Sequence, residues 1–167
     1  MVSRFTVAVV CVSLLGAAGL AQGKAAKPKK PSGTPIDGTW HAKGTVTVAK
    51  HISDAAVGQK VTRTWTIKSA CSGACKTALS YRTSSGHQIN VPLQGKGKSW
   101  KGAVDKQVFS CSNGGTATGS LAFKLHVTGF TKKKKRRVAT AVTAIATQQG
   151  TGCAVVKEVV KFALNRA

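Results

Sequence analysis

From Ile36 onward, apolar and polar residues alternate along the chain. In GTWHAKGTVTVA, residues 38–49, Trp40, Ala42 and Val46 fall on one face, while threonines and charged residues fall on the other. The same alternation recurs in KVTRTWTIK, residues 60–68, and in SLAFKLHV, residues 120–127. Period-two alternation rich in threonine and valine is typical of antiparallel strands that bury one face. The sequence therefore predicts an all-β protein.

Turn-forming stretches rich in glycine and serine, such as SSG, GKGK and CSNGG, separate the alternating segments. Eight consecutive strands with mostly short connections predict an antiparallel up-and-down barrel, because closing the sheet removes its open edges. A two-sheet β-sandwich is the alternative. The predicted strands are residues 38–49, 60–69, 77–83, 87–94, 99–110, 118–129, 136–147 and 153–164.

The last of these segments, CAVVKEVVKFAL at residues 153–164, also fits an amphipathic helix. Val155, Val156, Val159 and Val160 would form one stripe of that helix, with Lys157 and Lys161 off it. Valine is β-branched and favours strands. The composition of the segment therefore favours a strand over a helix.

The first 23 residues have the layout of a secretory signal peptide. Arg4 precedes an apolar run at residues 5–15, and small residues follow, with cleavage expected after Ala21 or Gly23. The apolar run is shorter than the ~20 residues of a membrane-spanning helix, which disfavours the alternative of an uncleaved anchor. The protein is expected to be secreted and extracellular, or periplasmic or on the cell surface in a bacterium.

Residues 24–35, KAAKPKKPSGTP, contain lysine, proline, alanine and glycine and have no large apolar residue. Such a composition predicts a flexible basic leader. A single β-barrel domain is then expected from residue 36 to residue 167.

Cysteine content indicates two disulfides. Cys11 lies in the predicted signal, and four cysteines remain, an even number that favours disulfides in a secreted chain over a metal site. Counting strands alternately up and down places Cys71 and Cys75 at one end of the barrel, and Cys111 and Cys153 at the other. The predicted pairs are therefore Cys71–Cys75 and Cys111–Cys153.

The chain carries 26 lysines and arginines against four acidic residues, a formal net charge of +22. Such an excess favours anionic partners, with simple solubility as the alternative. The same strand counting gathers many cations in the turns at one end, where an anionic polymer or surface is expected to bind. The residues predicted for this polyanion site are Lys132, Lys133, Lys134, Lys135, Arg136, Arg137, Lys96, Lys98 and Lys76.

The opposite end is predicted to be a mouth formed by loops containing His51, Asp54, His87 and Asn113. Side chains expected in the barrel interior are Trp40, Arg63, Trp65 and Phe123. Arg63 shares the apolar face of its strand, and a buried cation needs a partner. Glu158 is the predicted partner, with an Arg63 that reaches water near the barrel end as the alternative.

Gly38-Thr39-Trp40 at the start of the first long strand resembles the Gly-x-Trp opening of lipocalins and their calycin relatives, and avidin-type barrels open similarly. The wider pattern resembles small secreted bacterial β-barrel proteins. In lipocalins the tryptophan closes the bottom of the barrel and stacks on an arginine near the end of the last strand. By resemblance, Arg166 takes that place. The side chains with which avidins contact biotin have no match here.

These features favour a secreted, non-enzymatic β-barrel that binds a small apolar ligand or a partner at its mouth. The alternative is a cationic protein that attaches to cell-wall or extracellular polyanions or to nucleic acid. No cofactor or metal is expected. A third hypothesis is a hydrolase that uses His51, His87 and Asp54, but the chain has only four acidic residues and no nucleophile elbow.

Overall fold

A computed structural model describes residues 32–72, 74–133 and 136–167 of the chain. The predicted signal peptide and the leader up to residue 31 lie outside these ranges, as do Lys134 and Lys135. The side chains of residues 71–75 and 133–136 are also outside the described part. Within the described residues, no helix is long and apolar enough to cross a membrane.

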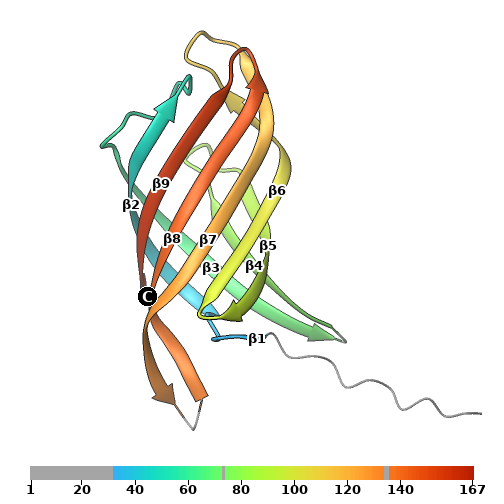
Figure 1. Cartoon of the computed structure of the whole chain (residues 1–167), viewed down its shortest axis with the longest axis vertical. Helices are drawn as coiled ribbons and strands as arrows, with labels where there is room; N and C mark the ends of the chain where they lie inside the picture. The colour runs from blue at the N-terminus through green and yellow to red at the C-terminus, as the bar shows by residue number, and fades with distance from the viewer. Residues whose placement is uncertain (1–31, 73, 134–135) are drawn as a thin grey trace, which may run out of the picture.

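Eight long antiparallel strands close into one barrel (Figure 1). Sequential neighbours pair along the chain, β9 pairs with β2, and a short pairing of β5 with β6 completes the closure. The up-and-down barrel predicted from the alternation is thus confirmed, and the sandwich alternative is wrong. The long strands are β2 (Gly38–Lys50), β3 (Lys60–Ser72), β4 (Ala74–Arg82), β5 (Gln88–Gly97), β6 (Ser99–Ser110), β7 (Thr116–Lys133), β8 (Arg136–Gly152) and β9 (Val156–Arg166).

The ambiguous last segment is a strand, as its valines favoured. β9 pairs with both β2 and β8, so its backbone groups are bonded on two sides. Val156, Val160 and Leu164 are buried in the barrel, while Lys157 and Lys161 face solvent. The β-branched residues therefore pack on a pleated, half-buried surface, which is the setting they prefer.

The connections divide between two ends of the barrel (Figure 1). One end, here called the hairpin end, carries the β3–β4, β5–β6 and β7–β8 turns. The other, called the mouth end, carries the β2–β3, β4–β5, β6–β7 and β8–β9 loops. β7 and β8 continue beyond the barrel as a projecting two-stranded hairpin in which Lys132 lies opposite Arg137. The predicted strand start at residue 136 agrees with β8, whereas Lys132, which was expected in the turn, belongs to β7.

A ninth, two-residue strand, β1 (Ser32–Gly33), pairs in parallel with the end of β5. The backbone N–H of Thr34 then donates to the carbonyl of Gly97 at 2.6 Å, and Trp100 Nε1 donates to the Thr34 carbonyl at 3.1 Å. The regular pairing thus begins within the predicted leader, four residues before Ile36.

Trp40 closes the hairpin end of the barrel. Its side chain is fully buried, its Nε1 donates to the Ile36 carbonyl at 2.9 Å, and it faces Trp65 on β3. The Arg166 guanidinium lies 5.4 Å from the centre of the Trp40 ring. This is the contact that the resemblance to lipocalins implied for Arg166.

Candidate functional site

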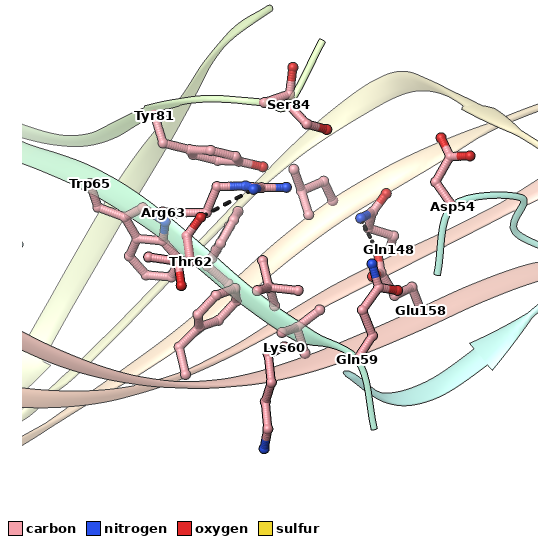
Figure 2. A pocket seen from close by; sticks show the side chains of 17 residues that line it. Asp54, Gln59, Lys60, Thr62, Arg63, Trp65, Tyr81, Ser84, Gln148 and Glu158 are labelled. Carbon is pink, nitrogen blue, oxygen red and sulfur yellow. Dashed lines mark hydrogen bonds between the residues drawn. The ribbon is translucent and has the colours of Figure 1, made fainter. Parts of the chain in front are cut away.

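The barrel contains a cavity of about 270 Å³ that lies toward the mouth end. Its walls come from the inward faces of strands β3, β4, β7, β8 and β9, because alternate residues of each strand point into the barrel. Residues of the β2–β3 and β4–β5 loops, among them Asp54 and Ser84, line its opening (Figure 2). The side chains used in the argument below are Arg63, Trp65, Tyr81, Phe123, Ala146, Gln148, Glu158 and Phe162.

Four aromatic rings form an apolar part of the cavity wall. The Trp65 ring centre lies 5.4 Å from that of Phe123, 4.9 Å from that of Phe162 and 6.2 Å from that of Tyr81. A Cβ atom at Gly44 would lie only 2.5 Å from the Phe162 ring, so glycine at this inward position makes room for it. Tilted and edge-to-face ring pairs stabilise such a cluster beyond its buried area. The rings offer a rigid apolar surface to a ligand.

Arg63 points into the cavity between Tyr81 and Trp65 (Figure 2). Its Nη1 donates to the carbonyl of the neighbouring Thr62 at 3.2 Å. The predicted ion pair with Glu158 is wrong, since no ion pair joins these two described residues. β2 separates β3 from β9 in the sheet, so the two side chains come from different parts of the cavity wall. The guanidinium is therefore exposed to the cavity contents.

Glu158 is 8% exposed and has a neutral partner. Its carboxylate accepts a hydrogen bond from Gln148 Nε2, on the adjacent strand β8, where the two residues lie opposite each other in register. Burial raises the pKa of Glu158, and the charge of Arg63 partly offsets that increase. Burial also raises the pKa of Tyr81 to about 12, so its hydroxyl is neutral and can donate at pH 7.

Trp65 Nε1 is a buried donor without a hydrogen-bond partner in the described structure. An unsatisfied buried donor costs about 1–3 kcal/mol. Trp65 lies beside Arg63 in the cavity wall (Figure 2). Arg63 therefore leaves donor capacity next to the cavity that an acceptor group of a ligand can use, whereas the Trp65 Nε1 atom has almost no accessible surface.

Replacing Glu158 with glutamine is expected to flatten the dependence of stability on pH. Because the folded-state pKa is raised, the carboxyl group binds its proton more tightly in the folded state than in the unfolded state. Its contribution to stability is thus present below the unfolded pKa and is lost as pH rises through the folded pKa. Urea unfolding between about pH 4 and pH 8 should show the stability of Glu158→Gln relative to wild type increasing with pH.

A difference between Glu158→Gln and wild type that stays constant over this pH range would contradict the expectation. Asp105→Asn serves as the control, since Asp105 is an exposed acidic residue on β6 away from the cavity. It reports the effect of removing one negative charge from the barrel surface.

The predicted mouth residues are divided between separate loops. Asp54 lines the cavity opening. The His51 carbonyl accepts a hydrogen bond from Ser112 N at 3.2 Å, and Ile52 forms a bridge with Cys111, so this loop is tied to the β6–β7 loop that contains exposed Asn113.

His87 lies on the β4–β5 side of the mouth, where its Nδ1 is 3.2 Å from Ser85 Oγ. Among the described residues, no group of three or more His, Cys, Asp and Glu side chains could hold a metal ion. His51, His87 and Asp54 are therefore not brought together as such a group.

The disulfide between Cys111 and Cys153 is confirmed, with a Cα–Cα distance of 6.6 Å. It joins the β6–β7 loop to the β8–β9 loop and packs in a small apolar cluster that includes Phe109, Ala117 and Val156. Cys71 and Cys75 lie opposite each other in the β3–β4 register, but their side chains are outside the described part.

The described members of the predicted polyanion site lie on separate hairpins at the hairpin end. Arg137 lies 4.5 Å and Lys98 lies 5.5 Å from the centre of the Phe130 ring, so the β5–β6 turn and the projecting hairpin do meet. Lys76 belongs to the β3–β4 hairpin, which ends on the other side of the hairpin end (Figure 1). Lys96 and Lys132 are exposed, and the side chains of residues 133–136 lie outside the described part.

No protein-family model and no curated protein matches this chain. The functional interpretation therefore rests on the cavity. Sequence reasoning missed Tyr81, Gln148 and Phe162 as cavity residues. Each of them lies two positions from a buried residue on the same strand, namely Leu79, Ala146 or Val160, and this alternation could have shown that they point inward.

Proposed function

We propose that this protein is a secreted, non-enzymatic binding protein that holds a small molecule inside its barrel. The cavity of about 270 Å³, with a partly apolar wall and an opening among the mouth loops, carries this proposal. Drug-sized ligands usually occupy pockets of about 300–1,000 Å³, so the ligand is expected to be smaller. The contact of Arg166 with Trp40 supports grouping the barrel with the lipocalin-like proteins.

The chemistry of the wall narrows the ligand to a small molecule with an apolar body and an acceptor or anionic group. The ring cluster would contact the apolar body. Arg63 would donate to the acceptor. Hydrogen bonds to a charged group contribute about 1.5–3 kcal/mol, so the anionic end would supply much of the affinity.

Ala146→Phe is expected to abolish binding of a planar aromatic carboxylate such as 2-naphthoate. Ala146 is buried in β8 and lines the cavity, so a phenyl ring there would fill space that the ligand needs. Isothermal titration calorimetry should show that the affinity falls at least about tenfold. This corresponds to a loss of about 1.4 kcal/mol or more of binding free energy. Ala103→Phe, which places the same ring on the exposed outer face of β6, should bind as wild type does.

A neutral analogue, 2-naphthamide, tests the role of Arg63. Arg63→Gln should weaken 2-naphthoate by roughly tenfold or more and 2-naphthamide much less, since only the carboxylate makes the charge-assisted contact. Equal affinity of wild type and Ala146→Phe for both compounds, in proteins with intact thermal transitions, would contradict binding in the cavity.

A further inference from the structure

A second hollow lies on the outside of the barrel, across the strands β5, β6, β7 and β8. This outer groove has a volume of about 640 Å³. Its floor is a row of inward-facing positions. In this row Gly95 lies opposite Trp100, Trp100 opposite Leu125 and Leu125 opposite Ala144. The groove therefore runs across the strands, along the direction of the backbone hydrogen bonds.

Outward-facing side chains form the two walls. Strand register places Gln94, Lys101, Lys124 and Ile145 opposite one another in one row. The second row consists of Lys96, Ser99, His126 and Thr143. Neighbouring strands lie about 4.8 Å apart, so the four strands give a track of roughly 15–20 Å. A linear chain fits such a track better than a compact molecule does.

The first row continues beyond the groove around the barrel. Ile145 lies opposite Lys161 on β9, Lys161 opposite Thr45 on β2, and Thr45 opposite Lys60 on β3. Lys60 Nζ donates to Thr45 Oγ1 at 3.0 Å, which holds this lysine on the outer face. Lys101, Lys124, Lys161 and Lys60 thus belong to one row of outward positions, here called the lysine row.

The lysine row has no acidic member among the described residues. The chain's four acidic residues are Asp37, Asp54, Asp105 and Glu158, and none of them occupies either wall of the outer groove. Lys101 and Lys124 lie directly opposite each other on adjacent strands, and like charges in such a pair destabilise a sheet. A bound anionic chain would relieve that repulsion and release its own counterions.

We infer that the outer groove and the lysine row bind a linear anionic polysaccharide, such as a sulfated or uronate-containing chain. The outer groove shares no lining residue with the cavity proposed above or with the projecting hairpin, and only Lys60, at the far end of the lysine row, also lines the cavity. Single-stranded nucleic acid is disfavoured, because its binding usually needs exposed rings on which bases stack. The aromatic residue of the groove, Trp100, is 3% exposed and points inward.

Titration of the full-length secreted protein with heparin tests this inference. Binding is measured from about 0.05 to 0.4 M salt, where the logarithm of the affinity should fall linearly with the logarithm of the salt concentration. The double variant Lys101→Ser with Lys124→Ser removes two charged contacts. The slope of log affinity against log salt concentration should therefore become smaller in magnitude by roughly 1–2. At about 0.15 M salt, we expect a loss of affinity of roughly tenfold or more.

Lys50→Ser with Lys157→Ser is the matched control. These two exposed lysines also lie opposite each other on adjacent strands, but they are outside the lysine row and the outer groove. The control removes the same charge and should change the slope by less than half as much. A second variant, Lys132→Ser with Arg137→Ser, tests the projecting hairpin in the same way.

The inference would be overturned by no binding to heparin, by binding that is independent of salt, by an equal loss in the control variant, or by a larger loss in the hairpin variant. Oligo-dT and vesicles containing phosphatidylserine are measured in parallel. If the groove variant weakens either of these more than it weakens heparin, the surface belongs to nucleic acid or lipid, and the polysaccharide assignment is wrong. Because the cavity residues are unchanged in every variant, failure here leaves 2-naphthoate binding unaffected.

Discussion

Trp40→Ala is expected to lower the free energy of unfolding by about 3–5 kcal/mol, the range for removing a buried tryptophan from a packed core. Trp40 is fully buried, packs at the closed end of the barrel and makes contacts with three segments of the chain. Its Nε1 donates to the Ile36 carbonyl, its backbone lies opposite Trp65 on β3, and Arg166 of β9 covers its ring. Truncation leaves a cavity and an unsatisfied carbonyl at the same place.

Chemical denaturation of the wild-type and variant proteins measures this effect. Trp40→Phe should cost less than Trp40→Ala, because it keeps most of the apolar volume and loses only the indole donor and part of the ring. Arg166→Ala removes the exposed cation above the ring and should cost about 0.5–1 kcal/mol. A Trp40→Ala variant that loses less than about 1 kcal/mol would show that the closed end contributes little to stability.

Removing the Cys111–Cys153 disulfide is expected to destabilise the barrel by roughly 4 kcal/mol. The two cysteines are 42 residues apart in sequence, and the crosslink limits the freedom of that long segment in the unfolded chain. The segment contains β7 and β8, the longest pair of strands. For a domain of this size, the thermal midpoint should fall by roughly 10 °C.

The double substitution Cys111→Ala with Cys153→Ala, compared with wild type under non-reducing conditions, measures the effect. Adding a reducing agent to the double variant reports what any remaining disulfide contributes. Reduction of the wild type should destabilise it at least as much as the double substitution does. A double variant with an unchanged midpoint would mean that the crosslink does not constrain the unfolded chain.

Much of the fold follows from the sequence because strand signals are local. Alternation along each segment sets which residues point inward, and short turns force neighbouring strands to be antiparallel. Counting strands then places each loop at one end, which is why the Cys111–Cys153 pair could be predicted without a structure. The preference of valine for strands resolved β9 for the same local reason.

The interactions that depend on distances across the barrel could not be predicted in this way. The alternation along the strands correctly predicted that Arg63 and Glu158 point inward. It could not show that the two side chains are separated or that Gln148 donates a hydrogen bond to Glu158. Whether an inward set of side chains fills the barrel depends on their summed volume and on the strand tilt. These are properties of the closed sheet, so the cavity was not visible in any one strand.

The outer groove depended on the tertiary structure for a related reason. Bulges between Val104 and Gln107 and between Val127 and Gly129 shift the register of β6, β7 and β8, and such bulges have no clear local signal in this chain. A change of register by one residue moves a side chain to the other face of the sheet. The sequence by itself determined the eight long strands of the barrel, the inward face of each and the excess of positive charge. The tertiary structure decided which inward side chains meet around the cavity and which lysines align across the strands, because both depend on pairing between segments distant in sequence.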